Sequence, residues 1–431
     1  MLQLEEAIWQ ILEILYMKIV HISHLYHPSS GGVQFFFKNI SERLVRDYGD
    51  DVTVVTTNSY YGPERSLFKK IEPAREVING VKVVRFAYRR WHIKPYSFIF
   101  KVFAKLGIKT PEWMVLQANG PYSSEMKEYL MNLQADAFCA SSSNYYYMQL
   151  PLWRKCNFFY FGSIHWQHDE NKSSLSSTQV ASINASTLCL ANTAYEKNRL
   201  IKSGVNPEKI FVLGVGVDTT PFVDVEAEDV ADFRKEIGVP ANALLIGYAG
   251  RIERTKNVLL LINAFEKVAV QYREVYLLIA GSASDYVAEL QAYCKTLDKE
   301  VARRIKWQVN FPIEKKALVF NSMDMLVLPS HNESFGIVFL EAWSCRKPVI
   351  GVSIGAVRDV ICDGVDGLLM KMNNEHSLVE KLTKLITNET LRKTLGENGF
   401  AKVQENFTWD IITARLRQCY TGAGVAKKEI V

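Results

Sequence analysis

Residues 325–352 predict a strand, a helix and a second strand in direct succession. The strands are expected over Met325–Pro329 (MLVLP) and Lys347–Val352 (KPVIGV), because both are short apolar runs of strand length. The segment between them is long enough for one crossover helix, which we expect to begin near Phe335 or Gly336. Such a unit indicates an α/β protein with a parallel sheet.

Two carboxylates, Glu333 and Glu341, lie in this unit with seven residues between them. Glu333 falls in the loop before the helix, and Glu341 lies more than a turn inside it. The free N–H groups at the start of a helix favour an anion such as phosphate, and Gly336 allows that anion to come close. Glu341 would then hold a ribose through two vicinal hydroxyls, while Glu333 faces a second polyhydroxylated group. The alternative is that both glutamates are solvated helix-end residues.

A second strand-to-helix loop follows the apolar strand that starts at Ala243. Its sequence GYAGRIERTKNV, Gly247–Val258, carries two cations, Arg251 and Lys256, five residues apart. Two such loops on one sheet edge predict an anion site.

The order of these features resembles the retaining glycosyltransferases of family 4, whose fold is called GT-B. The family's E-x7-E motif falls on Glu333 and Glu341, and its G-R-x4-K element falls on Gly250, Arg251 and Lys256. The resemblance implies that Arg251 and Lys256 bind the diphosphate of a nucleotide sugar, most simply UDP- or GDP-linked. It also implies that Glu341 binds the ribose and Glu333 the transferred sugar. The other donor-binding residues it implies are Ser334, Phe335, Gly336 and Ile337.

The resemblance covers most of the 431 residues and implies two Rossmann-like, doubly wound α/β domains facing each other across a cleft. The length agrees, since it suits two domains of roughly 200 residues each. We expect residues 1–217 to bind the acceptor and residues 218–404 to bind the donor, with a final helix at 405–424 packed back on the first domain. In the linker between them Gly216 stands where the family usually has Asn, and we expect it to keep a tight turn.

The first half predicts further alternation of strands and helices, beginning with a strand at Lys18–Ser23 and a helix at Val33–Asp47. Between these elements, Gly31 and Gly32 let the backbone run close to a ligand at the mouth of the sheet. The resemblance implies that this loop contacts the donor diphosphate.

His165 ends a strand predicted over Asn157–Ile164, where open α/β sheets bind ligands. The resemblance implies that His165 contacts the transferred sugar and serves in catalysis together with Glu333, Arg251 and Lys256. His168 would complete a metal pair with His165, but no third ligand lies nearby in the sequence, so we expect no metal there.

The favoured function is a retaining transferase that moves a hexose-type sugar from a nucleotide-diphosphate sugar to a hydroxyl of a glycan, a lipid-linked acceptor or a small molecule. The alternative is a nucleotide-sugar-binding or epimerising protein of the same fold. A dinucleotide oxidoreductase would carry G-x-G-x-x-G after its first strand, and the chain lacks it. The chain also lacks the D-x-D of metal-dependent transferases, so we expect no metal or other cofactor, with Arg251 and Lys256 neutralising the leaving diphosphate.

Residues 82–109 contain eight Lys or Arg, no Asp or Glu, and interleaved aromatic residues. Such a segment could dock on an anionic membrane surface or stack with single-stranded nucleic acid, or it could be a solvated basic face with buried aromatics. In the family, this part of the first domain approaches the bilayer when the acceptor is lipid-linked. The formal charge of +5 is mild, and we expect no nucleic-acid partner.

Seven scattered cysteines without a C-x-x-C pair suit a reducing cytoplasm, with peripheral attachment at the inner face of a membrane as the further expectation. No apolar run is long enough for a spanning helix. Residues 1–16 carry acids but no Lys or Arg, which excludes a signal peptide. Either they form an added amphipathic helix or translation starts at Met17, directly before the first strand.

Overall fold

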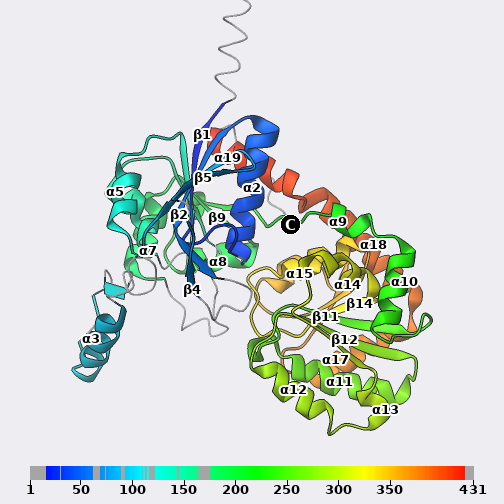
Figure 1. Ribbon diagram of the computed structural model, residues 1–431. Coiled ribbons are helices and arrows are strands. Elements are labelled where there is room, and N and C mark those ends of the chain that lie inside the picture. Colours follow the sequence, from blue (N-terminus) through cyan, green and yellow to red (C-terminus); the bar gives the residue numbers. More distant parts are fainter. Residues whose placement is uncertain are drawn as a thin grey trace, which may run out of the picture. The chain divides into compact units, whose positions relative to one another are not determined.

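The computed structural model describes residues 16–422, except 30, 62–67, 73, 89–92, 109, 112–113, 116–121, 143–144, 163 and 165–174. The chain forms two compact units (Figure 1). Among the described residues, the first unit holds those up to Ile164, those from 175 to Gly214 and those from Ile412 onward, and the second unit is Val215–Ile411. The expectations for residues 1–15 and for His165 fall outside the described residues.

The first unit is built on a mostly parallel sheet. Within its described part, eight strands lie in the order β10-β9-β8-β7-β1-β2-β6-β5, and only the edge strand β5 runs antiparallel to its neighbour. The strands are β1 Lys18–Ile22, β2 Asp51–Thr57, β5 Arg75–Ile78, β6 Val81–Phe86, β7 Ala137–Ser141, β8 Phe158–Phe161, β9 Leu188–Ala191 and β10 Ile210–Val212. The sequences AFCAS of β7 and FFYF of β8 are continuous buried runs, as expected for parallel strands covered on both faces. A separate antiparallel pair joins β3 (Ser59–Tyr61) to β4 (Phe68–Lys70).

The helices of the first unit form where apolar residues recur at helical spacing, and polar side chains cap the starts of α5, α7 and α8. In α2 (Gly32–Tyr48) the buried residues include Phe36, Ile40 and Leu44, four apart along one face. Ser123 accepts a hydrogen bond from the N–H of Met126 and so caps the start of α5. The remaining helices are α3 Ile93–Lys105, α5 Ser124–Asn132, α6 Leu150–Trp153, α7 Ser177–Ala185 and α8 Ala194–Lys202.

The second unit has a six-stranded, entirely parallel sheet in the order β13-β12-β11-β14-β15-β16. Its strands are β11 Leu244–Ala249, β12 Val275–Gly281, β13 Ile305–Val309, β14 Met325–Leu328, β15 Val349–Val352 and β16 Gly367–Met370. Its helices are α9 Thr220–Val223, α10 Ala227–Glu236, α11 Val258–Gln271, α12 Tyr286–Cys294, α13 Lys299–Ala302, α14 Lys316–Ser322, α15 Ile337–Ser344, α16 Val357–Val360, α17 Glu375–Thr387 and α18 Glu389–Asn406.

Both sheets reverse their winding beside their first strand. In the second unit the chain moves outward from β11 through β12 to β13, then returns to place β14 on the other side of β11. The first unit does the same, with β2 and β7 on opposite sides of β1. Loops that leave the carboxyl ends of strands at such a switch point diverge, which opens a ligand crevice.

The last helix, α19 (Trp409–Thr421), links the two units. Its later part belongs to the first unit, where the Tyr420 hydroxyl bonds His21 of β1 at 3.1 Å. Its first residue, Trp409, lies against Gly216: a Cβ added at Gly216 would be 2.5 Å from the indole ring. The chain forms no turn at Gly216, so the prediction of a tight turn there is wrong, and close packing on Trp409 explains the glycine.

The main elements agree with the sequence-based expectations. The helix predicted over Val33–Asp47 is confirmed as α2, and the strand–helix–strand unit at 325–352 is confirmed as β14, α15 and β15. The edge strands β5 and β16 were not predicted. No helix among the described residues is long and apolar enough to cross a membrane.

Candidate functional site

The candidate site lies at the switch point of the second sheet. The loop that leaves β11 carries Arg251 and Lys256, and the loop that leaves the adjacent strand β14 carries Glu333. The N–H of His331 donates to the carbonyl of Thr255 at 3.0 Å, so the backbone itself ties the two loops together. The predicted coming together of these two loops is thus confirmed.

Two glycines allow the β11 loop to fold tightly beside the sheet. Gly281, at the end of β12, has a φ of 147°, and a Cβ there would be 1.6 Å from the carbonyl oxygen of Gly250. No side chain can be added at such a distance, so the Gly250 backbone comes up against β12.

The cations of the β11 loop have different partners. Lys256 Nζ donates to Glu333 Oε1 at 2.6 Å, and the two side chains are only 16% and 14% exposed. Arg251 is 50% exposed and pairs at 3.0 Å with its neighbour Glu253. Arg254, which the sequence analysis did not single out, pairs with Glu289 on α12 and points to solvent. Lys256 is therefore the cation that the fold holds against Glu333.

Tyr248, on β11, holds the backbone of this loop through a hydrogen bond. Its hydroxyl donates to the carbonyl of Arg251 at 2.6 Å. Burial, together with the negative charge of Glu333, raises the pKa of Tyr248 well above its usual value. Tyr248 therefore stays a neutral donor and fixes the backbone that carries Arg251.

The β14 loop turns into α15 at Gly336. This glycine has a φ of 87°, and a Cβ there would be 2.5 Å from the ring of Phe339, so only glycine fits. Phe335 is buried and meets the Phe407 ring edge-on, 5.6 Å between centroids. The Phe335 side chain packs into the interior and holds the loop in place. Only the backbone of Phe335 is therefore left to contact a donor. Ser334 and Ile337, predicted on either side, are half-buried.

Glu341 has a partner that the sequence analysis missed. It is 4% exposed on α15, and its Oε1 accepts a short hydrogen bond from Lys316, the first residue of α14. Its Oε2 has no hydrogen-bond partner among the described residues, and the same holds for Ser330 Oγ and His331 Nε2 in the preceding loop. Buried polar atoms without partners are costly, and they mark a place where a polar ligand can bind. No motif in the sequence pointed to Lys316.

In the first unit, the predicted site residues Gly31 and Gly32 follow strand β1. Gly31 is the N-cap of α2, and a Cβ there would be 2.3 Å from Gln34 Oε1. A Cβ at Gly32 would meet nothing within 4 Å, so no steric requirement for glycine exists there. Beyond β8, the N–H of Ile164 donates at 2.9 Å to the buried Glu196, whose pKa burial raises to about 7.

The second unit matches a known protein family. Residues 229–402 match the model described as glycosyl transferases group 1. This range contains Arg251, Lys256, Lys316, Glu333 and Glu341.

Curated relatives and solved structures agree with that match. The D-inositol 3-phosphate glycosyltransferase of Xylanimonas cellulosilytica is 31% identical over 245 residues, which cover 56% of this chain and 58% of that protein. The capsular polysaccharide biosynthesis glycosyltransferase CapM of Staphylococcus aureus is 30% identical over 234 residues, covering 52% and 58%. The chain thus spans little more than half the length of these relatives.

Among solved structures, Anabaena Alr3699/HepE in complex with UDP-glucose superposes with a TM-score of 0.69 at 18% identity, covering 94% of this chain and 100% of the other. At that identity the likeness concerns the fold alone. Residues 229–402 therefore resemble the glycosyl transferases group 1, and one mostly parallel and one entirely parallel sheet with interleaved helices give the chain the α/β, two-domain GT-B fold.

Proposed function

We propose that this protein is a retaining glycosyltransferase that moves a hexose-type sugar from a UDP- or GDP-linked donor to an acceptor hydroxyl. The observation that carries the proposal is the half-buried pair of Lys256 and Glu333 at the switch point, with Arg251 in the same loop. A cation and a carboxylate held together there suit a ligand with an anionic diphosphate next to a polyhydroxylated ring.

In the proposed reaction the bond from the anomeric carbon to the diphosphate oxygen breaks, and a bond to the acceptor oxygen forms on the same face. The proton of the acceptor hydroxyl passes to the departing diphosphate oxygen. Lys256 and Arg251 stabilise the charge on the leaving group, and Glu333 orients the sugar without attacking it. His165 is proposed to bond a sugar hydroxyl. No metal is proposed, because Arg251 and Lys256 supply the positive charge that the leaving diphosphate needs.

Donor binding tests the first half of this proposal. UDP, GDP and their glucose, galactose, mannose and N-acetylglucosamine derivatives would be screened by thermal denaturation, since a ligand that binds the folded state raises the midpoint. We expect one nucleotide series to stabilise the protein. If none does at millimolar concentration, the proposal fails. Stabilisation without transfer to any acceptor would favour the nucleotide-sugar-binding or epimerising alternative.

Product stereochemistry tests the second half. Proton NMR of the product should show the anomeric configuration of the donor. An inverted centre, or a sugar trapped covalently on Glu333 and found by mass spectrometry, would each contradict the same-face mechanism.

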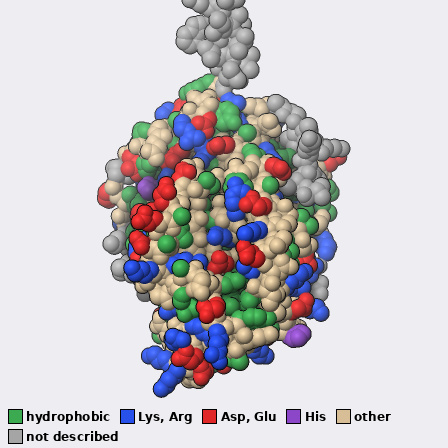
Figure 2. All heavy atoms as spheres, turned by 90° about the vertical axis from the view of Figure 1, so that its right-hand side faces the viewer, with side chains coloured by type: hydrophobic (Ala, Val, Ile, Leu, Met, Phe, Trp, Pro, Cys, Tyr) green, Lys and Arg blue, Asp and Glu red, His purple; other side chains and the backbone are tan. Residues whose placement is uncertain are grey.

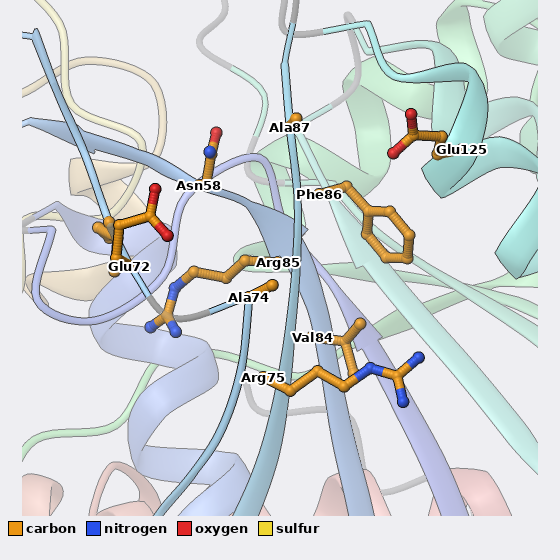
Figure 3. Close-up of a pocket in the computed structure, with 10 residues that line it drawn as sticks. Asn58, Glu72, Ala74, Arg75, Val84, Arg85, Phe86, Ala87 and Glu125 are labelled. Atoms are coloured by element: carbon orange, nitrogen blue, oxygen red, sulfur yellow. The ribbon is translucent and has the colours of Figure 1, made fainter.

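The acceptor is proposed to bind the first unit. A cavity of about 330 Å³ lies at the carboxyl ends of β2 and β6, lined among others by Asn58, Glu72, Arg75 and Glu125 (Figure 3). Its size suits a sugar or a similar polyol. The side chain of Arg85 is fully buried beside it and pairs with Glu76, which holds this wall in place. Changing Asn58 to Ala should raise the KM for the acceptor and leave donor binding unchanged.

A lipid-linked acceptor is proposed because of α3. Phe98 is 69% and Leu106 65% exposed, and among the side chains of α3 that the structure describes none is buried. Lys101 and Lys105 are exposed on the same helix. Apolar and basic side chains together favour an anionic membrane surface, at the inner face of a membrane if the protein is cytoplasmic as expected.

Liposome flotation tests this contact. The protein should float with anionic vesicles, and the variant with Lys101 and Lys105 changed to Glu should not. Lys295 and Lys299, exposed in the second unit, provide a control with the same change of charge. Equal recovery of both variants would contradict the membrane proposal. Nucleic acid is not proposed as a partner: on the face drawn in Figure 2, basic side chains are interspersed with acidic ones.

A further inference from the structure

Lys316 and Glu341 form an asymmetric pair. The Lys316 ammonium bonds Glu341 Oε1, while Glu341 Oε2 is buried without a partner among the described residues. The carboxylate side chain is 6% exposed and the lysine side chain 31% exposed. The pair therefore lies at the border of the interior, with the cation on the side nearer to solvent.

This asymmetry limits what the carboxylate can accept. A free carboxylate offers both oxygens to two neighbouring hydroxyls, as we predicted from the sequence for a ribose. With one oxygen occupied by a charged donor, the other is left to accept a single strong hydrogen bond from a ligand. The buried oxygen also lacks water to replace that bond, so a ligand without the matching hydroxyl leaves it unsatisfied.

We propose that Lys316 is a positioning residue for the nucleoside part of the donor, which turns Glu341 toward one ribose hydroxyl instead of two. This inference rests on the proposed function, since it assumes a nucleotide donor at this site. The inference assigns a role to Lys316 and predicts a specificity. Of the 2′-deoxy and 3′-deoxy forms of the nucleotide, the protein should bind one much more weakly than the ribonucleotide and the other only slightly more weakly.

The test measures binding by isothermal titration calorimetry. UDP and GDP are compared, and the tighter of the two is tested with its 2′-deoxy and 3′-deoxy forms. The wild type should lose about ten- to a hundredfold in affinity for one deoxy form and less than about threefold for the other. Lys316→Met should bring the two losses within about threefold of each other, and Glu341→Gln should do the same.

Lys315 supplies the matched control. It is the adjacent residue and pairs at 3.0 Å with Glu236, where both side chains are exposed. Lys315→Met should keep the wild-type difference between the two deoxy forms. Lys316→Leu also removes the donor and replaces Lys316→Met in the test if the latter shows no cooperative thermal transition.

The outcomes separate this inference from the proposed function. If Lys316→Met keeps the wild-type difference, Lys316 does not act through Glu341 and the inference is wrong. If the wild type binds both deoxy forms as tightly as the ribonucleotide, the inference is wrong while donor binding stands. If the wild type binds neither UDP nor GDP, the proposed function fails, and the inference with it.

Discussion

The side chains of Lys256 and Arg254 come from the same loop but differ in how far they are exposed to solvent. The Lys256 side chain is 16% exposed against Glu333, whereas that of Arg254 is 70% exposed against Glu289. A charge-assisted bond shielded from water contributes about 1.5–3 kcal/mol, and an exposed ion pair about 0–1 kcal/mol. Lys256→Ala should therefore weaken UDP or GDP binding about ten- to a hundredfold in calorimetry, while Arg254→Ala should change it less than about threefold. Equal losses in the two variants would contradict the assignment of Lys256 to the diphosphate.

His21 provides a prediction about pH. Its ring bonds Ser41 Oγ at 2.7 Å and the Tyr420 hydroxyl at 3.1 Å, and burial lowers its pKa from 6.5 to about 3. Because the folded-state pKa lies below the unfolded one, the unfolded chain binds the extra proton between these values. The stability contribution of neutral His21 is complete above pH 6.5 and is lost as the pH falls toward 3.

Urea denaturation at pH 6 and pH 4 measures this effect. The free energy of unfolding of the wild type should fall more steeply between these pH values than that of His21→Leu, by up to about 1.4 kcal/mol per pH unit. His376, exposed on α17, gives the control variant His376→Leu, which should follow the wild type. If His21→Leu follows the wild type as well, His21 is not neutral in the folded state.

Among the elements, α11 depends on one side chain from outside it. The guanidinium of Arg304, 5% exposed, donates to the carbonyls of Ala269, Tyr272 and Arg273 at 2.8 to 3.1 Å. These are carbonyls at and just beyond the end of the helix, which have no partner inside it. A positive charge there also suits the helix dipole.

Arg304→Met should lower the free energy of unfolding of the second unit by roughly 2–4 kcal/mol, because three carbonyls, one of them buried, lose their donor together. The neighbouring Arg303 is 65% exposed and pairs with Glu300, so Arg303→Met should cost less than about 1 kcal/mol. Thermal denaturation compares the two variants. A midpoint for Arg304→Met as high as that of Arg303→Met would contradict this role.

At the scale of the whole molecule, α19 joins the last part of the chain to the first. Arg417 bonds the buried carboxylate of Asp50 at 2.9 and 3.1 Å, and Asp50 also accepts the N–H of Met17 at 3.0 Å. The two charged side chains are 12% and 0% exposed. Removing one partner from a buried ion pair costs about 3–5 kcal/mol, because the other charge stays in the interior.

Arg417→Met should therefore destabilise the first unit by about that amount, although the change lies at the opposite end of the sequence. Arg46→Met removes an equal charge from the exposed pair with Asp47 and should cost less than about 1 kcal/mol. Urea denaturation distinguishes them. A stability of Arg417→Met within error of the wild type would show that α19 does not hold the first unit together.

The sequence by itself determined the strands and helices with strong patterns and the residue types of the site. The strands predicted over Met325–Pro329 and Lys347–Val352 are present as β14 and β15, since a continuous apolar run bounded by polar residues predicts a buried strand. Edge strands such as β5, with its alternating exposed residues, carry little apolar signal and were missed. That the loops carrying Arg251, Lys256 and Glu333 come together was predicted, because strand-to-helix loops of a parallel sheet meet at one edge.

Which charged groups pair was decided only by the tertiary structure. Lys256 pairs with Glu333 across 77 residues, and Lys316 with Glu341 across 25, because β14 adjoins β11 and α14 comes close to α15. Arg251, equal to Lys256 in the sequence pattern, pairs instead with Glu253, two residues further along the chain. Spacing along the chain predicts which residues share a loop. Strand order and burial determine which charged side chains are removed from water and therefore form an ion pair. For that reason Lys316 emerged from the fold and not from the sequence.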